Sequence, residues 1–363
     1  YQWNMKQINL DAALNGIGQE VKDIAVAVID SGSPTVNSTA WNASNFISGG
    51  YDFVSSTSNG DGNGIDNDPT DPNSNSISGK SHGTHVATTI GIKNDGDGLN
   101  GMAAKVLPLR VFSTNGSATL SDILNAIRYA AGLSNDSGSV APTSIPVKVI
   151  NLSLKGGGWD CSIFADVAAQ GISVVAAAGN NGDESPGSLN YPASCANVIS
   201  VASTNALDER AYYSQFNSSV DIAAPGGATY EDVDGNGIQD GVPAFHNDTV
   251  IQFIQGTSMA APHVAGAVAL MYAVDSNMNP STVNSFLQNG YLTDDIGATG
   301  RDDSFGYGRL NLSKAMEYTL NNIGDNSNTY FTASPNYIDF GDVTSQSSIT
   351  LSKIGSGVLN VVS

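Results

Sequence analysis

Short apolar runs alternate with amphipathic stretches along most of the chain. The runs are rich in Val, Ile and Ala and are continuous, which is typical of strands that are covered on both faces. They predict strands at 24–29, 106–111, 147–152, 172–177 and 198–202. Periodic stretches predict helices at 119–131, 163–170, 258–274, 280–288 and 312–320. Because strands and helices alternate, we expect βαβ units and an α/β fold with a mainly parallel central sheet flanked by helices.

The pattern changes after residue 320. A polar stretch at 321–329 is typical of a linker. The segment 330–363 then carries strand-like pieces at 337–340, 348–351 and 358–362 and is too short to close a β-sandwich by itself. We therefore expect a main domain over 1–320 and a β-rich C-terminal extension. The extension is either the start of an immunoglobulin-like module or a tail that docks on the main domain.

The charge balance narrows the classes of partner. The 363 residues include 14 basic and 34 acidic ones, a formal net charge of −20, although charged residues are only 13% of the chain. A negative field disfavours nucleic acid and anionic membranes and favours cations. No apolar run approaches the ~20 residues of a membrane span. The sequence starts at Tyr1 with no signal-like segment, so we expect a processed mature form.

Three separated motifs carry the candidate chemistry. Asp30 ends an apolar run, His82 lies in Ser-His-Gly-Thr-His, and Ser258 lies in Gly-Thr-Ser-Met-Ala-Ala-Pro-His. A carboxylate can hold an imidazole in one tautomer, and the imidazole can then take the proton of a serine hydroxyl. A serine at a helix N-terminus also has backbone N–H groups beside its reacting carbonyl. The order Asp, His, Ser is that of subtilisin.

Each residue also has an ordinary structural interpretation. Asp30 alone would be a strand-end cap, His82 a cap or core histidine, and Ser258 an N-cap. The three motifs together, in this order, favour the catalytic interpretation. We interpret His85 and His263, which lie in the same two motifs, as structural.

The motifs closely resemble those of the subtilisin-like serine proteases (the subtilase family, peptidase S8) of the extracellular bacterial type, over roughly residues 1–318. This resemblance implies a subtilisin-like three-layer sandwich and a secreted serine endopeptidase. It implies a triad of Asp30, His82 and Ser258, with Asn180 and the Ser258 backbone N–H as oxyanion donors. It further implies protein or peptide substrates, a propeptide before maturation (a zymogen) and a monomer.

The resemblance also implies a cleft that binds substrate as an extended strand. The implied edges, walls and floor are Gly116, Ser117, Ala118, Ser153, Leu154, Lys155, Gly156, Ala177, Ala178, Gly179 and Asn190. Two residues depart from the family pattern. Lys155 stands where glycine is usual, and it either recruits an acidic side chain or points to solvent. Asn190 replaces a frequent glycine and predicts a shallower, more polar pocket.

Three acidic loops, rich in Gly and Asn, offer oxygen ligands to Ca²⁺. The first, matched to the family, comprises Gln2, Lys93, Asp95, Asp97 and Leu99, with Asp52 as a candidate further carboxylate. The second comprises Asp61, Asp66, Asp68 and Asp71. The third comprises Asp232, Asp234, Asn236 and Asp240 and follows an EF-hand pattern without its terminal Glu. Each loop is alternatively a solvated turn. The His and Cys spacing of zinc sites is absent from the sequence.

Cys161 and Cys195 are the two cysteines of the chain. They are either two buried thiols or one disulfide, and a secreted context favours the disulfide. The function also has alternatives to the endopeptidase. One is a pseudoprotease that acts as a binding module. The intact triad and Asn180 argue against it. The other is an esterase or amidase that uses the same chemistry as a side activity.

Overall fold

A computed structural model describes residues 2–17, 22–33, 45–58, 60–72, 81–92, 99–233, 235–247, 250–323, 330–334 and 350–354, the last two ranges by their backbone alone. Within these ranges the centre of the fold is a nine-stranded sheet of order β10-β11-β7-β6-β5-β4-β1-β3-β2. Its strands pair in parallel, except that the edge strand β10 runs antiparallel to β11. This confirms the predicted α/β class.

The elements alternate along the chain as the apolar pattern predicts. The sheet strands are β1 Ala25–Asp30, β2 Tyr51–Asp52, β3 Lys105–Arg110, β4 Val147–Leu152, β5 Ser173–Ala177, β6 Val198–Thr204, β7 Ile222–Pro225, β10 Thr293–Asp294 and β11 Arg309–Leu310. The helices are α1 Trp3–Gln7, α2 Leu10–Ile17, α3 His82–Gly91, α4 Leu120–Ala130, α5 Ile163–Ala169, α6 Thr257–Val274, α7 Pro280–Gln288 and α8 Leu312–Asn321. A separate antiparallel hairpin joins β8 Val242–Phe245 to β9 Ile251–Ile254.

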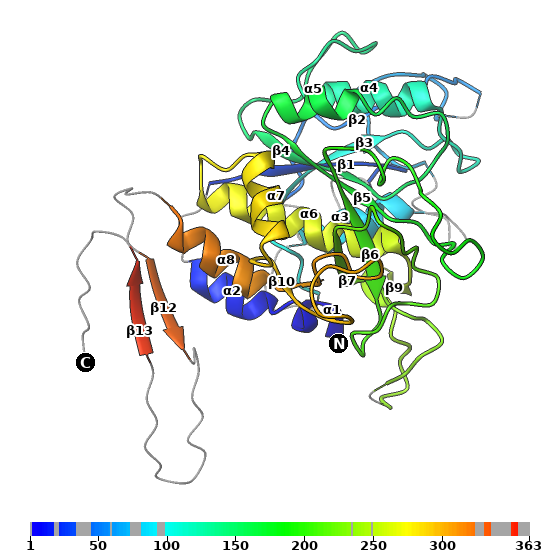
Figure 1. The fold of residues 1–363 in the computed structure, drawn as a ribbon. Coiled ribbons are helices and arrows are strands. Elements are labelled where there is room, and N and C mark those ends of the chain that lie inside the picture. The colour runs from blue at the N-terminus through cyan, green and yellow to red at the C-terminus, as the bar shows by residue number, and fades with distance from the viewer. Residues whose placement is uncertain are drawn as a thin grey trace.

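Helices cover both faces of the sheet, which explains why its strands are continuously apolar (Figure 1). In β1, Val26 and Val28 pack in one core cluster with residues of α1, α2, α3, α6, α7 and α8. Ala25, Ala27 and Ile29 point to the other face and pack with residues of α4 and α5. The two clusters are the two inner layers of a three-layer α/β/α sandwich.

Helix α6 is the centre of the larger layer. Every one of its residues is buried except Ser258. By length and composition it is the one helix among the described residues that is apolar enough to cross a membrane, yet 94% of its 18 residues are buried inside the protein. The expectation that no such run exists was therefore wrong, but the run serves here as a core helix.

The predicted strands and helices agree with the structure to within one or two residues at each end. The sequence analysis missed α1 and α2, which have five and eight residues, the four-residue strands β7, β8 and β9, and the two-residue strands β2, β10 and β11. Such short elements have too few turns or alternations to give a periodic signal. Their conformation comes from docking on the rest of the domain.

Beyond α8, β12 Tyr330–Ser334 pairs antiparallel with β13 Thr350–Ile354. The hairpin lies beside α2 and α8 at one side of the domain (Figure 1). The predicted piece 348–351 overlaps β13, and β12 was not predicted. The pieces 337–340 and 358–362, and most of the linker 321–329, lie outside the described residues.

Candidate active site

The carboxyl end of β1 places Asp30 at the edge of the sheet, where the parallel strands end together. Its side chain is 1% exposed. Oδ1 accepts hydrogen bonds from the Ser31 backbone N–H at 2.7 Å and from His82 Nδ1 at 2.8 Å, and Oδ2 lies 3.0 Å from the same nitrogen. Because the carboxylate accepts, Nδ1 carries the proton, and Nε2 is left as the basic nitrogen of His82.

His82 is the first residue of α3, and its side chain is 36% exposed. Desolvation disfavours the imidazolium, but the charge of the Asp30 carboxylate and its hydrogen bond outweigh that effect. Together they raise the pKa of His82 above its ordinary value of 6.5. The histidine therefore combines a buried, charged partner on one nitrogen with access to solvent, which is what a general base requires.

Ser258 is the second residue of α6 and pairs with Ser153, which follows β4. The Ser258 hydroxyl donates to the Ser153 carbonyl at 3.2 Å, and the Ser153 hydroxyl donates to the Ser258 carbonyl at 2.8 Å. Ser153 lines a cavity of about 220 Å³ together with Asp30 and His82. Asp30 and His82 thus line one cleft with Ser153, and Ser258 is hydrogen-bonded to Ser153, with its hydroxyl directed at the Ser153 carbonyl in this conformation.

Asn180, which follows β5, is anchored to the start of α6. Its Oδ1 accepts from the Thr257 N–H at 2.9 Å and from the Thr257 hydroxyl at 2.7 Å. The same hydroxyl accepts from the Gly179 N–H at 3.1 Å. Two donors on Oδ1 fix which end of the amide is oxygen. The Nδ2 donor of this exposed residue is therefore the other end of the amide, and it lies near the start of α6: a Cβ on Gly256 would meet Asn180 Nδ2 at 3.4 Å and the Ser258 backbone nitrogen at 3.7 Å.

Two of the predicted cleft residues, Gly116 and Ser153, line this cavity. Ser117 lies beside Gly116 in the turn that follows β3, where its carbonyl accepts from the Ser113 N–H at 2.9 Å. Asp71, expected in an acidic loop, also lines the cavity, and four further lining residues were missed by the sequence analysis: Ser31, Phe112, Ser113 and Thr114. Their position immediately after a predicted strand was the available signal, since the carboxyl ends of parallel strands share one edge.

Several other predicted cleft residues face the protein interior. Leu154 packs in the smaller core cluster at 6% exposure. Ala177 and Ala178 are 4% and 1% exposed, while Ala118 is half-buried. The buried side chains of Leu154, Ala177 and Ala178 therefore leave mainly their backbone for contact with a substrate.

Lys155 and Asn190, the two residues that depart from the family pattern, each contact other residues of the protein. Lys155 is exposed, and its Nζ donates to Asn181 Oδ1, so it is already engaged across the rim. Next to it, the Gly156 N–H donates to the Tyr191 carbonyl at 3.0 Å. A Cβ on Gly179 would lie 2.5 Å from Asn190 Nδ2, which shows that the predicted wall and floor are in direct contact.

The first acidic loop is only partly described. Gln2 exchanges two hydrogen bonds with the Asn100 backbone, at 2.8 and 2.6 Å, and so lies at the end of this loop beside Leu99. Lys93, Asp95 and Asp97 lie outside the described residues. Asp52, the candidate further carboxylate, already has protein partners. Its oxygens accept from the Val54 N–H and from Arg110, and burial raises its pKa to about 7.

The second acidic set is divided by the structure. Asp66 and Asp68 accept hydrogen bonds from backbone N–H groups of their own loop, and Asp61 lies 3.8 Å from Arg110. Asp71 is 2% exposed and turns instead to Ser31, whose hydroxyl donates to it at 2.9 Å. We therefore correct the expectation that these four carboxylates form one group.

The third acidic loop closes on itself. Asp232 accepts from the N–H groups of Asn236 and Gly237 at 3.0 and 2.9 Å, and the buried Asp240 accepts from the Val233 N–H at 2.7 Å. Asp234 lies outside the described residues. In the part of the chain that the structure describes, no three His, Cys, Asp or Glu side chains gather closely enough to hold a metal ion.

The other two histidines of the motifs are packed in the core. His85 Nε2 lies 3.0 and 3.2 Å from the carbonyls of Val242 and Gln252, and burial lowers its pKa to about 3. His263 Nδ1 lies 2.9 Å from the Met259 carbonyl, its Nε2 lies 2.9 Å from Asn4 Nδ2, and burial lowers its pKa to about 4. Both rings are neutral at pH 7, in agreement with their structural interpretation.

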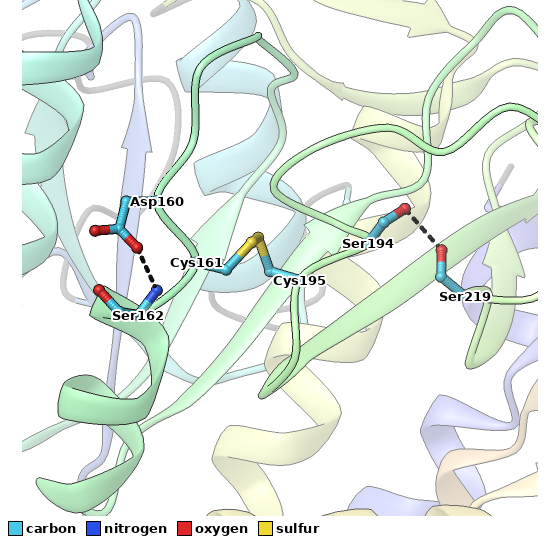
Figure 2. The surroundings of a disulfide bond; sticks show 6 residues. All are labelled: Asp160, Cys161, Ser162, Ser194, Cys195 and Ser219. Carbon is cyan, nitrogen blue, oxygen red and sulfur yellow. Dashed lines mark hydrogen bonds between the residues drawn. A yellow bond between two sulfur atoms is a disulfide. The ribbon is translucent and has the colours of Figure 1, made fainter.

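Cys161 and Cys195 form a disulfide (Figure 2). The bond links the segment before α5 to the segment that follows Asn190, 34 residues along the chain. Figure 2 shows Ser194, next to Cys195, in a 2.7 Å hydrogen bond with Ser219. The oxyanion candidate Asn180 lies within the loop that the disulfide closes.

Comparison with known proteins gives a consistent result. A family model described as Peptidase_S8, subtilase family, matches residues 21–308. An extracellular protease of Xanthomonas campestris is 38% identical over 285 residues, which are 73% of this chain and 46% of that protein. Thermitase of Thermoactinomyces vulgaris is 33% identical over 81% of this chain and 88% of its own length. A solved structure of a protease from Pseudoalteromonas arctica is 33% identical, with a TM-score of 0.73 over 88% of this chain and 97% of its own. The chain thus spans about half of the first relative and most of the other two.

Proposed function

The chain belongs to the subtilase family of serine endopeptidases, and on that premise we propose that it hydrolyses peptide bonds in proteins with Ser258 as the nucleophile and His82 as the general base. The carrying observation is the contact between His82 Nδ1 and Asp30 at 2.8 Å, made by a ring that remains 36% exposed beside the cleft. The match to the family confirms the resemblance found in the sequence. The individual catalytic roles are inferred from the geometry.

In this mechanism a substrate carbonyl enters the cleft, and the Ser258 hydroxyl leaves the Ser153 carbonyl to attack it. His82 Nε2 takes the hydroxyl proton, and Asp30 stabilises the imidazolium that forms. The negative oxygen of the tetrahedral intermediate is bound by Asn180 Nδ2 and by the Ser258 backbone N–H. The imidazolium then protonates the leaving amine, and water releases the acyl group by the same steps.

The substrate-binding roles of the cleft residues follow from their positions. Gly116 and Ser153 line the same cleft, so we expect an extended peptide to add a strand between the exposed backbone at 116–117 and the segment after Ser153. The side chain that precedes the cut would enter between 154–156 and 177–179, with Asn190 as the floor. Because Lys155 is already bonded to Asn181, we expect no strong preference for an acidic residue there.

Secretion, maturation from a propeptide, action as a monomer and calcium binding are part of the same proposal. Secretion is supported by the names of relatives, such as the extracellular protease of Xanthomonas campestris, and by the disulfide. Calcium is supported by the net charge of −20 and by the first and third acidic loops. Bound Ca²⁺ would supply a positive charge that relieves repulsion among loop carboxylates.

The catalytic proposal is tested with casein and a serine-directed covalent inhibitor. We expect hydrolysis that the inhibitor abolishes, an adduct mapped by mass spectrometry to Ser258, and loss of activity in Ser258→Ala. If purified protein leaves casein intact but still binds it, the binding-module alternative replaces the enzyme. If only ester substrates are cleaved, the esterase alternative does.

The calcium proposal is tested separately by thermal unfolding. Removal of Ca²⁺ with a chelator should lower the Tm, and added Ca²⁺ should restore it, since a ligand that binds only the folded state stabilises it. Mg²⁺ at the same concentration is the matched control. An unchanged Tm across a chelator and Ca²⁺ series would contradict the proposal.

A further inference from the structure

A buried carboxylate that the mechanism does not use lies directly behind the Asp30–His82 pair. Asp71 is 2% exposed, and it lines the same cleft as Asp30 and His82. Its Oδ2 accepts a hydrogen bond from the Ser31 hydroxyl at 2.9 Å. Ser31 is the residue that follows Asp30, so Asp71 is connected to the catalytic acid through one side chain.

Ser31 is bonded to both members of the pair. Its backbone N–H donates to Asp30 Oδ1 at 2.7 Å. Its hydroxyl accepts from the backbone N–H of Gly83, the residue after His82, at 2.9 Å. One serine therefore fixes the carboxylate of the acid and the first turn of the helix that carries the base.

Helix α3 depends on this external hydroxyl. Ser81 occupies its N-cap but makes no hydrogen bond to the helix through its side chain, and the buried Ser81 Oγ has no partner among the described residues. The first N–H groups of a helix otherwise lack partners within it. The Ser31 hydroxyl is such a partner, and it comes from another segment of the chain. It can accept a hydrogen bond from the Gly83 N–H because its own proton is donated to Asp71.

The backbone holds Asp71 in this position. The Ser33 N–H donates to the Pro69 carbonyl at 3.0 Å, and the Asp71 N–H donates to the Ser33 carbonyl at 2.8 Å. Gly32, between Ser31 and Ser33 in the chain, has φ of +104°, and a Cβ on Gly32 would lie 2.5 Å from the Pro69 carbonyl oxygen. The segment 69–71 thus crosses the turn after Asp30 at contact distance.

We propose that Asp71 and Ser31 are positioning residues for catalysis, which align His82 with Asp30 by orienting one hydroxyl toward the start of α3. The inference rests on the proposed function, since it concerns the same His82. It assigns to Asp71 a role in aligning the general base His82, in place of the calcium-binding role expected for it in the second acidic loop. Neither residue touches the reacting atoms.

The test is kinetic and spectroscopic. Ser31→Ala and Asp71→Ala should each lower kcat about tenfold with KM within about twofold, because a misaligned base affects the transition state more than substrate binding. The double variant should be no slower than the slower single variant, since both act through one hydrogen-bond chain. Asp71→Asn, which keeps an acceptor oxygen and the shape, should recover most of the rate, and Ser31→Ala, which deletes the same hydrogen bond, carries the test if Asp71→Ala does not fold.

Ser33→Ala is the matched control. Ser33 lies in the same turn at 1% exposure, but its hydroxyl has no hydrogen-bond partner among the described residues. We expect its kcat to equal that of the unmodified protein. A purely structural role for Asp71 would lower Tm in Asp71→Ala while leaving kcat at temperatures well below Tm unchanged, and that outcome would overturn the proposal.

A readout independent of turnover separates this inference from the proposed function. The proton between His82 Nδ1 and Asp30 should give a downfield ¹H NMR signal that shifts or broadens in Ser31→Ala and Asp71→Ala but not in Ser33→Ala. If the variants give this pattern of signals but the unmodified protein does not hydrolyse casein, only the proposed function is refuted. If the unmodified protein is active but the NMR signal is the same in all variants, only the positioning role is refuted.

Discussion

The anchoring of Asn180 by Thr257 allows a quantitative prediction for the oxyanion site. Replacing Thr257 by valine keeps the shape of the side chain but removes its hydroxyl. The change deletes the 2.7 Å bond to Asn180 Oδ1 and the 3.1 Å bond from the Gly179 N–H. The 2.9 Å bond from the Thr257 backbone N–H to Asn180 remains. Thr257→Val therefore loosens the oxyanion donor without removing it.

The expected size follows from the number of bonds lost. A neutral hydrogen bond contributes about 1 kcal/mol net, which corresponds to roughly a fivefold change in the population of the aligned amide. We expect Thr257→Val to lower kcat about five- to tenfold and to leave KM unchanged. Asn180→Ala should lower kcat about 10²–10³-fold, a range that was measured on subtilisin itself. The Gly179 N–H, left without a partner, should lower stability by about 1–3 kcal/mol.

The assay is steady-state hydrolysis of a peptide anilide, with active sites counted by a covalent inhibitor so that unfolded protein does not bias kcat. Thr257→Ser, which keeps the hydroxyl, is the control and should stay within about twofold of the unmodified protein. If Thr257→Val has the same kcat while Asn180→Ala is strongly impaired, the amide is held in place by something other than this hydroxyl. The anchoring role would then be refuted.

Three further predictions concern pH and stability. Since the pKa of His82 is raised above 6.5 and the base must be neutral, kcat/KM should fall as pH drops through that pKa. Asp30→Asn should move this acidic limb of the pH profile to lower pH and cut the rate by about 10⁴. If the acidic limb does not move in Asp30→Asn, a group other than His82 titrates there. Replacing both Cys161 and Cys195 by serine should cost about 3–4 kcal/mol for a 34-residue separation, seen as a lower Tm, and an unchanged Tm would contradict the loop-entropy account. His263 is neutral when folded, with its pKa lowered to about 4, whereas the unfolded chain takes up the proton near 6.5. Stability should therefore fall between about pH 6.5 and 4, and His263→Gln should reduce that dependence of Tm on pH; an equally steep dependence in the variant would contradict this account.

Much of the fold was predictable because it depends on short stretches of sequence. Strands covered on both faces need unbroken apolar runs, so β1 and β4 to β6 could be located from composition alone. The same holds for α6, whose small apolar residues predict a buried helix. The short helices α1 and α2 and the strands of two to four residues, β2 and β7 to β11, could not be predicted, since their conformation is fixed by contacts with distant residues.

The sequence by itself determined the candidate chemistry, because a strand end, a helix start and the identity of Asp30, His82 and Ser258 are local properties. Tertiary structure alone decided the direction of each polar side chain: the Ser258 hydroxyl faces Ser153, and Asp71 leaves the acidic loop for Ser31. Such pairs lie 105 and 40 residues apart. Their hydrogen bonds depend on ångström-scale distances that only the packing of the helices against the sheet sets, and a linear pattern does not carry that information.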